Sequence, residues 1–195
     1  MIMNRNEIDA IDKKLKTELN ERRYIHTKGV AYTASALAAT YGYNVDKALL
    51  AGYLHDCAKC LPDDTAFKLC LENNVKVSEI EYENTALIHA KAGYVYARLE
   101  YGIDDTDILN AILYHTTGRP QMSDLEKIIY VADYIEPNMK KIEGLDEIRK
   151  ISMIDIDKAV YMISENTLNY LKKSGSLIDD MTVKTYEYYK NIIEV

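Results

Sequence analysis

The sequence predicts an all-α protein, and three observations carry this prediction. Apolar residues recur at three- and four-residue intervals through most of the chain, as on the buried face of an α-helix. No segment alternates apolar and polar residues over the length of a strand, and no hairpin pattern occurs. The chain holds only three prolines, so long helices can run unbroken. Its 195 residues can bury a full core, and we expect one domain.

The first three helices are delimited by apolar stripes and by residues that favour helix ends. Apolar residues at helical spacing cover 8–19, and a second stripe covers 24–41, where a glycine follows and can end the helix. Asp46 can serve as the N-cap of a third helix. We expect that helix to end at the adjacent residues His55 and Asp56, before a loop that contains a proline.

The next helices begin at recognisable caps. Pro62 precedes two aspartates that suit the first turn of a fourth helix. Ser78 is followed three residues later by a glutamate, which is a capping box before a short segment. A further helix is expected over residues 90–101. Asp105 can cap the helix that follows it, over residues 108–115.

The remaining helices complete the bundle. Ser123 and Glu126 form a second capping box, which opens a strongly apolar run that leads to Asp133. Glu136 and Pro137 can close this helix. Two or three more helices are expected near residues 146–151, 157–173 and 181–193.

Composition narrows the location and the partners. The net charge of −7 argues against broad nucleic-acid binding, which relies on a basic face. No apolar run approaches the roughly 20 residues of a membrane span, and residues 1–5 lack the apolar core of a signal peptide. Three cysteines fit a reducing compartment, so we expect a cytoplasmic protein. Two of them, Cys57 and Cys60, have C-x-x-C spacing, but no second pair completes a zinc site, and we interpret both as incidental thiols.

Four histidines and two aspartates could converge on a metal. Three of the histidines fall where an expected helix begins or ends, which is where a site built from several elements can present short side chains. Asp133 lies in a stretch otherwise suited to burial, where an unpaired carboxylate would cost several kcal/mol and therefore needs a cation or donors. Taken singly, a histidine is more often a surface or hydrogen-bonded residue, and an aspartate at a helix end is usually a cap. The candidate ligands are His26, His55, Asp56, His89, His115 and Asp133.

The order of these residues, and the segments around them, resemble a known family. The chain is similar to the HD-domain phosphohydrolase superfamily and, within it, to the YqeK-type symmetrical bis(5′-nucleosyl)-tetraphosphatases. The similarity runs from about Arg22 to the last helices. The segments that carry it are Arg23-Tyr24-Ile25-His26-Thr27, His55-Asp56-Cys57-Ala58-Lys59, Tyr114-His115-Thr116-Thr117-Gly118-Arg119-Pro120 and Glu126-Lys127-Ile128-Ile129-Tyr130-Val131-Ala132-Asp133-Tyr134-Ile135-Glu136-Pro137.

The resemblance implies a single HD domain over residues 1–195, with a core of about 22–137 and C-terminal helices of about 146–193 packed on it. A dinuclear metal site would lie in a cleft between helices. The family is associated with iron, although imidazole and carboxylate ligands also accept manganese, cobalt, nickel or zinc, and magnesium stays open. One metal would be held by His26, His55, Asp56 and Asp133, and a second by Asp56, His89 and His115, with Asp56 bridging.

The implied reaction is the symmetrical cleavage of diadenosine tetraphosphate into two ADP by a hydroxide that bridges the metals. Asp56, Lys59 and Arg119 would be the catalytic residues, the two cations stabilising charge on the phosphoryl oxygens. Arg23 would either bind phosphate or pair with an acid near the site. Thr116 and Thr117 could donate to phosphate, or they could instead satisfy the last carbonyls of the helix before them. The substrate contacts would be Arg23, Lys59, Thr116, Thr117 and Arg119.

Two other functions remain open. The same metal site could hydrolyse another nucleotide, namely a nucleoside monophosphate, a deoxynucleoside triphosphate or a cyclic nucleotide. The fold could also act as a nucleotide-sensing module with little turnover. The resemblance further implies a homodimer, with partner contacts on the last helices. The chain departs from the family pattern at Cys57, and at Lys91, where proline is common in the family.

Overall fold

A computed structural model describes residues 5–139 and 142–194 of the chain. Every secondary-structure element in that part is a helix. The all-α prediction is confirmed. Residues 1–4, on which part of the signal-peptide argument rests, lie outside the described residues. In chain order the elements are α1 (Arg5–Glu18), α2 (Glu21–Thr40), α3 (Val45–Leu54), α4 (Asp63–Glu72), α5 (Glu79–Glu83), the 3-10 turn η1 (Thr85–Leu87), α6 (Ile88–Glu100), α7 (Thr106–Tyr114), α8 (Asp124–Ile135), α9 (Leu145–Ile151), α10 (Ile156–Ser174) and α11 (Asp180–Ile193).

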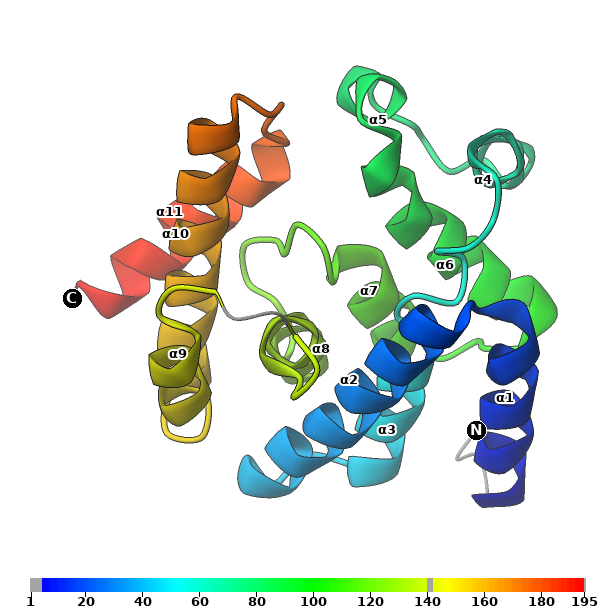
Figure 1. The fold of residues 1–195 in the computed structure, drawn as a ribbon, viewed down its shortest axis with the longest axis horizontal. Helices are drawn as coiled ribbons and strands as arrows, with labels where there is room; N and C mark the ends of the chain where they lie inside the picture. Colours follow the sequence, from blue (N-terminus) through cyan, green and yellow to red (C-terminus); the bar gives the residue numbers. More distant parts are fainter. Residues whose placement is uncertain (1–4, 140–141, 195) are drawn as a thin grey trace.

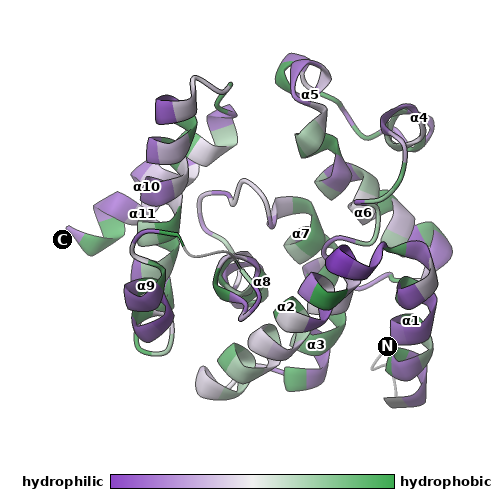
Figure 2. Ribbon diagram, viewed as in Figure 1, coloured by the Kyte–Doolittle hydropathy of each residue, from purple (hydrophilic) through white to green (hydrophobic). Residues whose placement is uncertain are grey.

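Helix α8 is the central element of the bundle. Figure 1 shows it nearly end-on, with α2 on one side and α10 on the other, and it contacts α3, α7 and α9 as well. Its apolar run is fully buried, which explains why this segment is hydrophobic on more than one face. Helix α7, beside it, is also largely hydrophobic, whereas α9 on the outside carries more hydrophilic residues (Figure 2). The residue that follows this buried run is Asp133, so the core itself positions that carboxylate.

Most of the expected helix starts are confirmed. Ser78 and Ser123 each form a capping box with the glutamate three residues later, and Asp105 accepts hydrogen bonds from two backbone amides at the start of α7. The prediction for Asp46 is wrong. The N-cap of α3 is Asn44, whose side chain accepts a hydrogen bond from the amide of residue 47 at 2.8 Å, while Asp46 lies in the first turn.

The segment before α6 differs from the expectation in one respect. The 3-10 turn η1 runs directly into α6, so His89 is the second residue of that helix instead of preceding it. All three expected C-terminal helices are present, and Asp155 and Asp179 cap the last two. No helix in the described part of the chain is both long and apolar enough to cross a membrane.

Candidate metal centre

The structure brings all six predicted ligands together, although they come from different parts of the fold. His26 lies on α2, His89 on α6 and Asp133 on α8, while the others follow the ends of α3 and α7. Ligand atoms within 4.8 Å of one another form two groups that share one aspartate. The first group consists of His26, His55 and Asp56, and the second group consists of Asp56, His89 and His115.

Asp56 lies at the centre, and each of its carboxylate oxygens faces a different pair of imidazoles. Oδ2 lies 3.4 Å from Nε2 of His55 and 3.8 Å from Nε2 of His26. Oδ1 lies 3.3 Å from Nε2 of His89 and 3.7 Å from Nε2 of His115. A carboxylate with one oxygen in each group has the geometry that two neighbouring cations would share.

Asp133 joins the first group. Its Oδ1 lies 2.9 Å from Nε2 of His26 and 3.6 Å from Nε2 of His55. The Asp133 side chain is 28% exposed, whereas that of Asp56 is almost completely buried. The first group is therefore the one with a carboxylate open toward solvent, where a substrate could approach.

Three of the imidazoles are oriented by the chain immediately before them. His55 and His115 directly follow the last helical residues of α3 and α7, and His89 follows η1. A carbonyl oxygen can only accept, so each Nδ1 donates its proton there and Nε2 is the ring nitrogen that faces the cluster. The hydrogen bonds from Nδ1 are all 2.7 Å long and run to the carbonyl oxygens three residues earlier, those of Gly52, Ala86 and Ile112.

The fourth imidazole is oriented by a carboxylate that sequence reasoning missed. Nδ1 of His26 lies 3.2 Å from Oε1 of Glu136, a residue only 1% exposed. The other oxygen of Glu136 accepts hydrogen bonds from the amide and the side chain of Asn138, at 2.7 and 3.0 Å. A Cβ atom at Gly29 would lie 2.3 Å from that oxygen, so a larger residue there would displace the carboxylate. No spacing rule connects these positions, and the sequence indicates Glu136 only as a helix end.

The charges of the cluster are set by mutual contact. Burial favours the neutral acid, yet His55, His115 and His89 hold the pKa of Asp56 well below its usual range. Asp133 behaves in the same way, since burial opposes its ionisation but His26 and the other imidazoles lower its pKa to about 2. Burial lowers the pKa of His89 to about 3. At neutral pH the cluster therefore combines ionised carboxylates with a neutral imidazole, as metal ligands require.

The donor set fits divalent metals. Nε2 of His55 is buried and has no hydrogen-bond partner among the described residues, which is costly unless a cation takes its lone pair. Nε2 of His26 and Oδ1 of Asp133 lie 2.9 Å apart, which is close enough to need a proton or a cation between them. Mixed imidazole and carboxylate ligands are those of Fe, Mn, Co, Ni and Zn sites.

Three of the predicted substrate contacts lie at the cluster. Nη1 of Arg23 donates to Oδ2 of Asp56 at 2.5 Å, which is the pairing with an acid that the sequence left open. Nζ of Lys59 lies 3.0 Å from Nδ1 of His89, and burial lowers the pKa of this lysine. Oγ1 of Thr116 lies 3.3 Å from Nε2 of His89. These groups surround the second metal group and the bridging carboxylate.

The other two predicted contacts are engaged within the protein. Nη2 of Arg119 donates to Oε1 of Glu126 at 2.9 Å, and Nε lies 2.8 Å from the other oxygen of this buried carboxylate. The hydroxyl of Thr117 donates to the next carbonyl, and its own carbonyl accepts a hydrogen bond from Thr185 on α11. Both arrangements hold the loop at residues 116–120 in place.

The two departures from the family pattern have structural partners. Nζ of Lys91 donates to Oε2 of Glu81 at 2.7 Å and to the carbonyl of Lys76 at 2.7 Å, so it ties α6 to the segment before it. Cys57 is buried and its pKa is raised, chiefly by burial, while Cys60 is exposed, and neither forms a disulfide. The different exposure of the two thiols and their free state support interpreting both cysteines as incidental.

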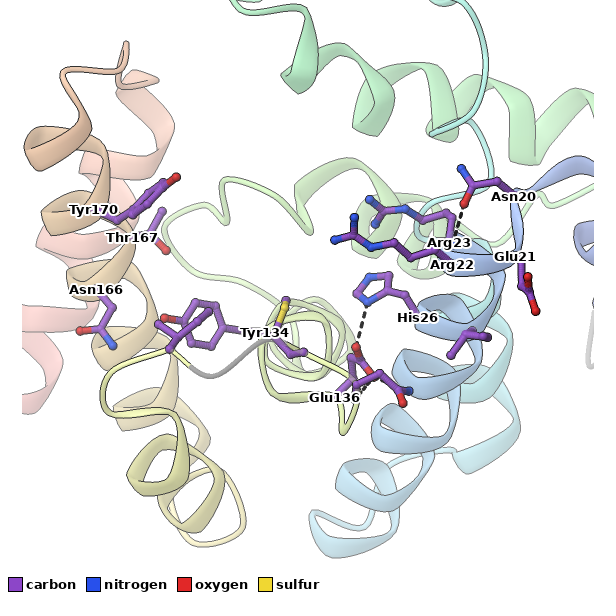
Figure 3. A pocket seen from close by; sticks show the side chains of 14 residues that line it. Asn20, Glu21, Arg22, Arg23, His26, Tyr134, Glu136, Asn166, Thr167 and Tyr170 are labelled. Atoms are coloured by element: carbon purple, nitrogen blue, oxygen red, sulfur yellow. Dashed lines mark hydrogen bonds and ion pairs between the residues drawn. The ribbon is translucent and has the colours of Figure 1, made fainter.

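A cavity of about 950 Å³ adjoins the cluster. Figure 3 shows it between the start of α2, the segment around the end of α8, and α10. It shares His26 and Arg23 with the cluster and extends to Tyr170 on α10. The space next to the metal ligands is thus large enough for a small molecule.

Comparison with known proteins gives a consistent result. The HD domain family matches residues 23–138. A symmetrical bis(5′-nucleosyl)-tetraphosphatase of Bacillus subtilis is 40% identical over 186 residues, covering 95% of this chain and 97% of the relative. One from Staphylococcus aureus is 35% identical and covers 93% and 94%. A crystal structure of a predicted HD superfamily hydrolase involved in NAD metabolism from Clostridium acetobutylicum has a TM-score of 0.90 and 41% identity, covering 94% of this chain and 97% of that one.

Proposed function

This chain belongs to the HD domain family, and from that membership we propose that it is a metal-dependent hydrolase that cleaves diadenosine tetraphosphate symmetrically into two ADP. One observation carries the proposal. Two groups of imidazole and carboxylate ligands share Asp56, in a chain 35% and 40% identical over nearly its whole length to proteins named for this activity. The first of these groups adjoins, through His26, a cavity that can hold part of a nucleotide.

We propose that the first metal is held by His26, His55, Asp56 and Asp133, and the second by the shared Asp56 with His89 and His115. The distances around Asp56 support this division. When bound, two divalent ions lower the pKa of a water and neutralise the phosphate it attacks. Iron is our proposed metal, with manganese, cobalt, nickel, zinc and magnesium as alternatives.

The protein groups would act on the phosphate chain by position and charge. The four Nδ1 contacts hold the imidazoles so that little rearrangement is needed during the reaction. Lys59 and Thr116, next to His89, would donate to phosphoryl oxygens. Arg23 would move its guanidinium from Asp56 to the substrate.

For Arg119 we propose a structural role besides the predicted phosphate contact. Its guanidinium would have to leave Glu126, which is almost completely buried, before it could reach a phosphate. The same ion pair fixes the loop that carries Thr116. Arg119 would thus support the site through that loop even without touching substrate.

We also propose one domain over residues 1–195, a cytoplasmic location and a homodimer that binds small nucleotides but neither nucleic acid nor membranes. The net charge of −7 supports the absence of nucleic acid. A hydrophobic core that includes residues from Ile8 on α1 to Tyr189 on α11 supports one domain.

The test is product analysis with diadenosine tetraphosphate and metal-analysed protein. We expect ADP alone as product, lost in Asp56→Ala but retained in Asp9→Ala, which alters an exposed aspartate of α1. ATP plus AMP would contradict symmetrical cleavage. Metal-loaded protein without turnover would favour another nucleotide substrate, and protein that binds no metal would favour a sensor.

A further inference from the structure

The cavity beside the metal cluster is larger than the reacting phosphates require. Its volume of about 950 Å³ lies at the upper end of the range typical of sites for small organic ligands. It begins at His26 and Arg23 and ends at α10, where Asn166, Thr167 and Tyr170 line it. A ligand that reaches the cluster therefore has room for a further group toward α10.

The wall nearest the cluster presents a free cation. Arg22 is exposed in the first turn of α2, and its guanidinium extends into the cavity beside that of Arg23 (Figure 3). Arg23 is paired with Asp56, whereas Arg22 forms no ion pair or hydrogen bond with the residues that the structure describes. In a chain with net charge −7, an unpaired guanidinium at this place suits an anion such as a phosphate.

The opposite wall presents aromatic faces. Tyr170 is 71% exposed and lines the cavity from α10, and Tyr134 lines it from α8 (Figure 3). Tyr134 directly follows Asp133, so this wall starts one residue from the cluster. An exposed tyrosine offers a flat apolar face, and stacking of a base on such a face is worth about 1–3 kcal/mol.

Arg22 and Tyr170 both lie outside the part of the chain that matches the HD domain family, whereas Tyr134 lies within it. That match covers residues 23–138, whereas Arg22 precedes it and Tyr170 follows it. The cluster belongs to the matched region, and α10 packs against α8 so that its side chains face the cluster across the cavity. The additions to the HD region can thus determine which molecule the cluster receives.

We propose that this cavity binds one nucleoside diphosphate half of the substrate, with Arg22 on its phosphates and the base stacked on Tyr170. The proposal rests on the proposed function, since it names the part of that substrate which lies beyond the metals. It also assigns to α10 a role in substrate selection, in addition to the partner contacts expected of the last helices.

The proposal is tested by measuring the equilibrium binding of ADP to metal-loaded protein with calorimetry. Tyr170→Ala should weaken ADP binding about 5- to 150-fold. Tyr170→Phe, which keeps the aromatic face, should retain most of the wild-type affinity for ADP. Pyrophosphate lacks a base, so its binding should change by less than about twofold in Tyr170→Ala. Arg22→Gln should weaken both ligands, while Arg98→Gln, which alters an exposed arginine of α6, should weaken neither.

The outcomes separate this proposal from the proposed function. Dependence of ADP binding on Tyr170 would support the cavity assignment even if diadenosine tetraphosphate were not cleaved. Unchanged ADP binding in Tyr170→Ala, or an equal loss of ADP and pyrophosphate binding, would overturn it even if cleavage occurred. Wild-type protein that binds no ADP would also overturn it.

Discussion

Nδ1 of His26 lies 3.2 Å from Oε1 of Glu136, so a buried carboxylate orients one imidazole of the cluster across 110 positions of sequence. The other three imidazoles use backbone carbonyls for the same purpose. Although burial opposes protonation of His26, its contacts with Asp133, Asp56 and Glu136 raise its pKa. A carboxylate behind a histidine makes that histidine a stronger metal ligand.

Replacing Glu136 should therefore weaken one metal site. We expect Glu136→Gln to lower the affinity of the metal site that includes His26 by about 10- to 100-fold, because the amide keeps the shape but loses the charge. Competition with a chelator, followed by metal analysis, measures this. Glu147→Gln, at an exposed position of α9, is the control. Unaltered metal affinity in Glu136→Gln would show that the contact does not tune the ligand.

Gly29→Ala should disturb the same contact from the other side. The added Cβ would lie 2.3 Å from Oε2 of Glu136, so the carboxylate must move away from its position behind His26. We expect lower metal affinity and a lower free energy of unfolding. In a Glu136→Ala background the added methyl group loses its closest neighbour, so the two substitutions should be non-additive. Additive effects in this double-mutant cycle would locate the cost of Gly29→Ala elsewhere.

Arg119→Ala should destabilise the protein through Glu126. The substitution leaves a buried carboxylate without its cation, which costs about 1–3 kcal/mol in the free energy of unfolding measured with urea. Lys127→Ala serves as a control. It removes a cation from α8, the helix that carries Glu126, and the acidic partners of Lys127 are more exposed than Glu126. If Arg119→Ala lowers turnover without lowering stability, the arginine acts on substrate and the supporting role is wrong.

The stability of metal-free protein should fall in weak acid because of His89. Burial lowers its pKa to about 3, whereas the unfolded chain has a value near 6.5. The unfolded state then binds the proton first, so this contribution is complete above about pH 6.5 and is lost as pH falls toward 3. Asp133, with a lowered pKa of about 2, contributes a loss only below about pH 4.

Thermal or urea unfolding of chelator-treated protein between pH 7 and pH 4 measures this dependence. His89→Gln, which cannot titrate, should show a shallower decline than wild type, and Lys91→Gln, which leaves the imidazole in place, should keep the wild-type slope. Parallel curves for wild type and His89→Gln would show that the buried imidazole does not control acid stability.

Local rules predicted the helices well. Periodicity and capping depend on residues within about four positions of each other, so they can be read along the chain. The capping boxes at Ser78 and Ser123 were confirmed for this reason. The error at Asp46 arose within the same local range, because Asn44, two residues earlier, offered an equally good cap.

The candidate ligands could also be proposed from sequence, because few residue types bind metals and a resemblance supplied their grouping. Their proximity in the structure agrees with that grouping, although their metal-binding roles stay predictions. The support for the site was not accessible in the same way. The partners Glu136 and Gly29 for His26, and Glu126 for Arg119, are ordinary residues that no local pattern singles out.

Local sequence patterns were enough to predict the helices, most of their caps and six side chains suited to metal binding. Which imidazoles face which oxygen of Asp56, and which side chain of α10 faces the cluster, depends on how the helices pack. The two kinds of information differ in range along the chain. Helix formation is governed by near neighbours, whereas these contacts depend on how α2, α8 and α10 pack, which the whole core determines together.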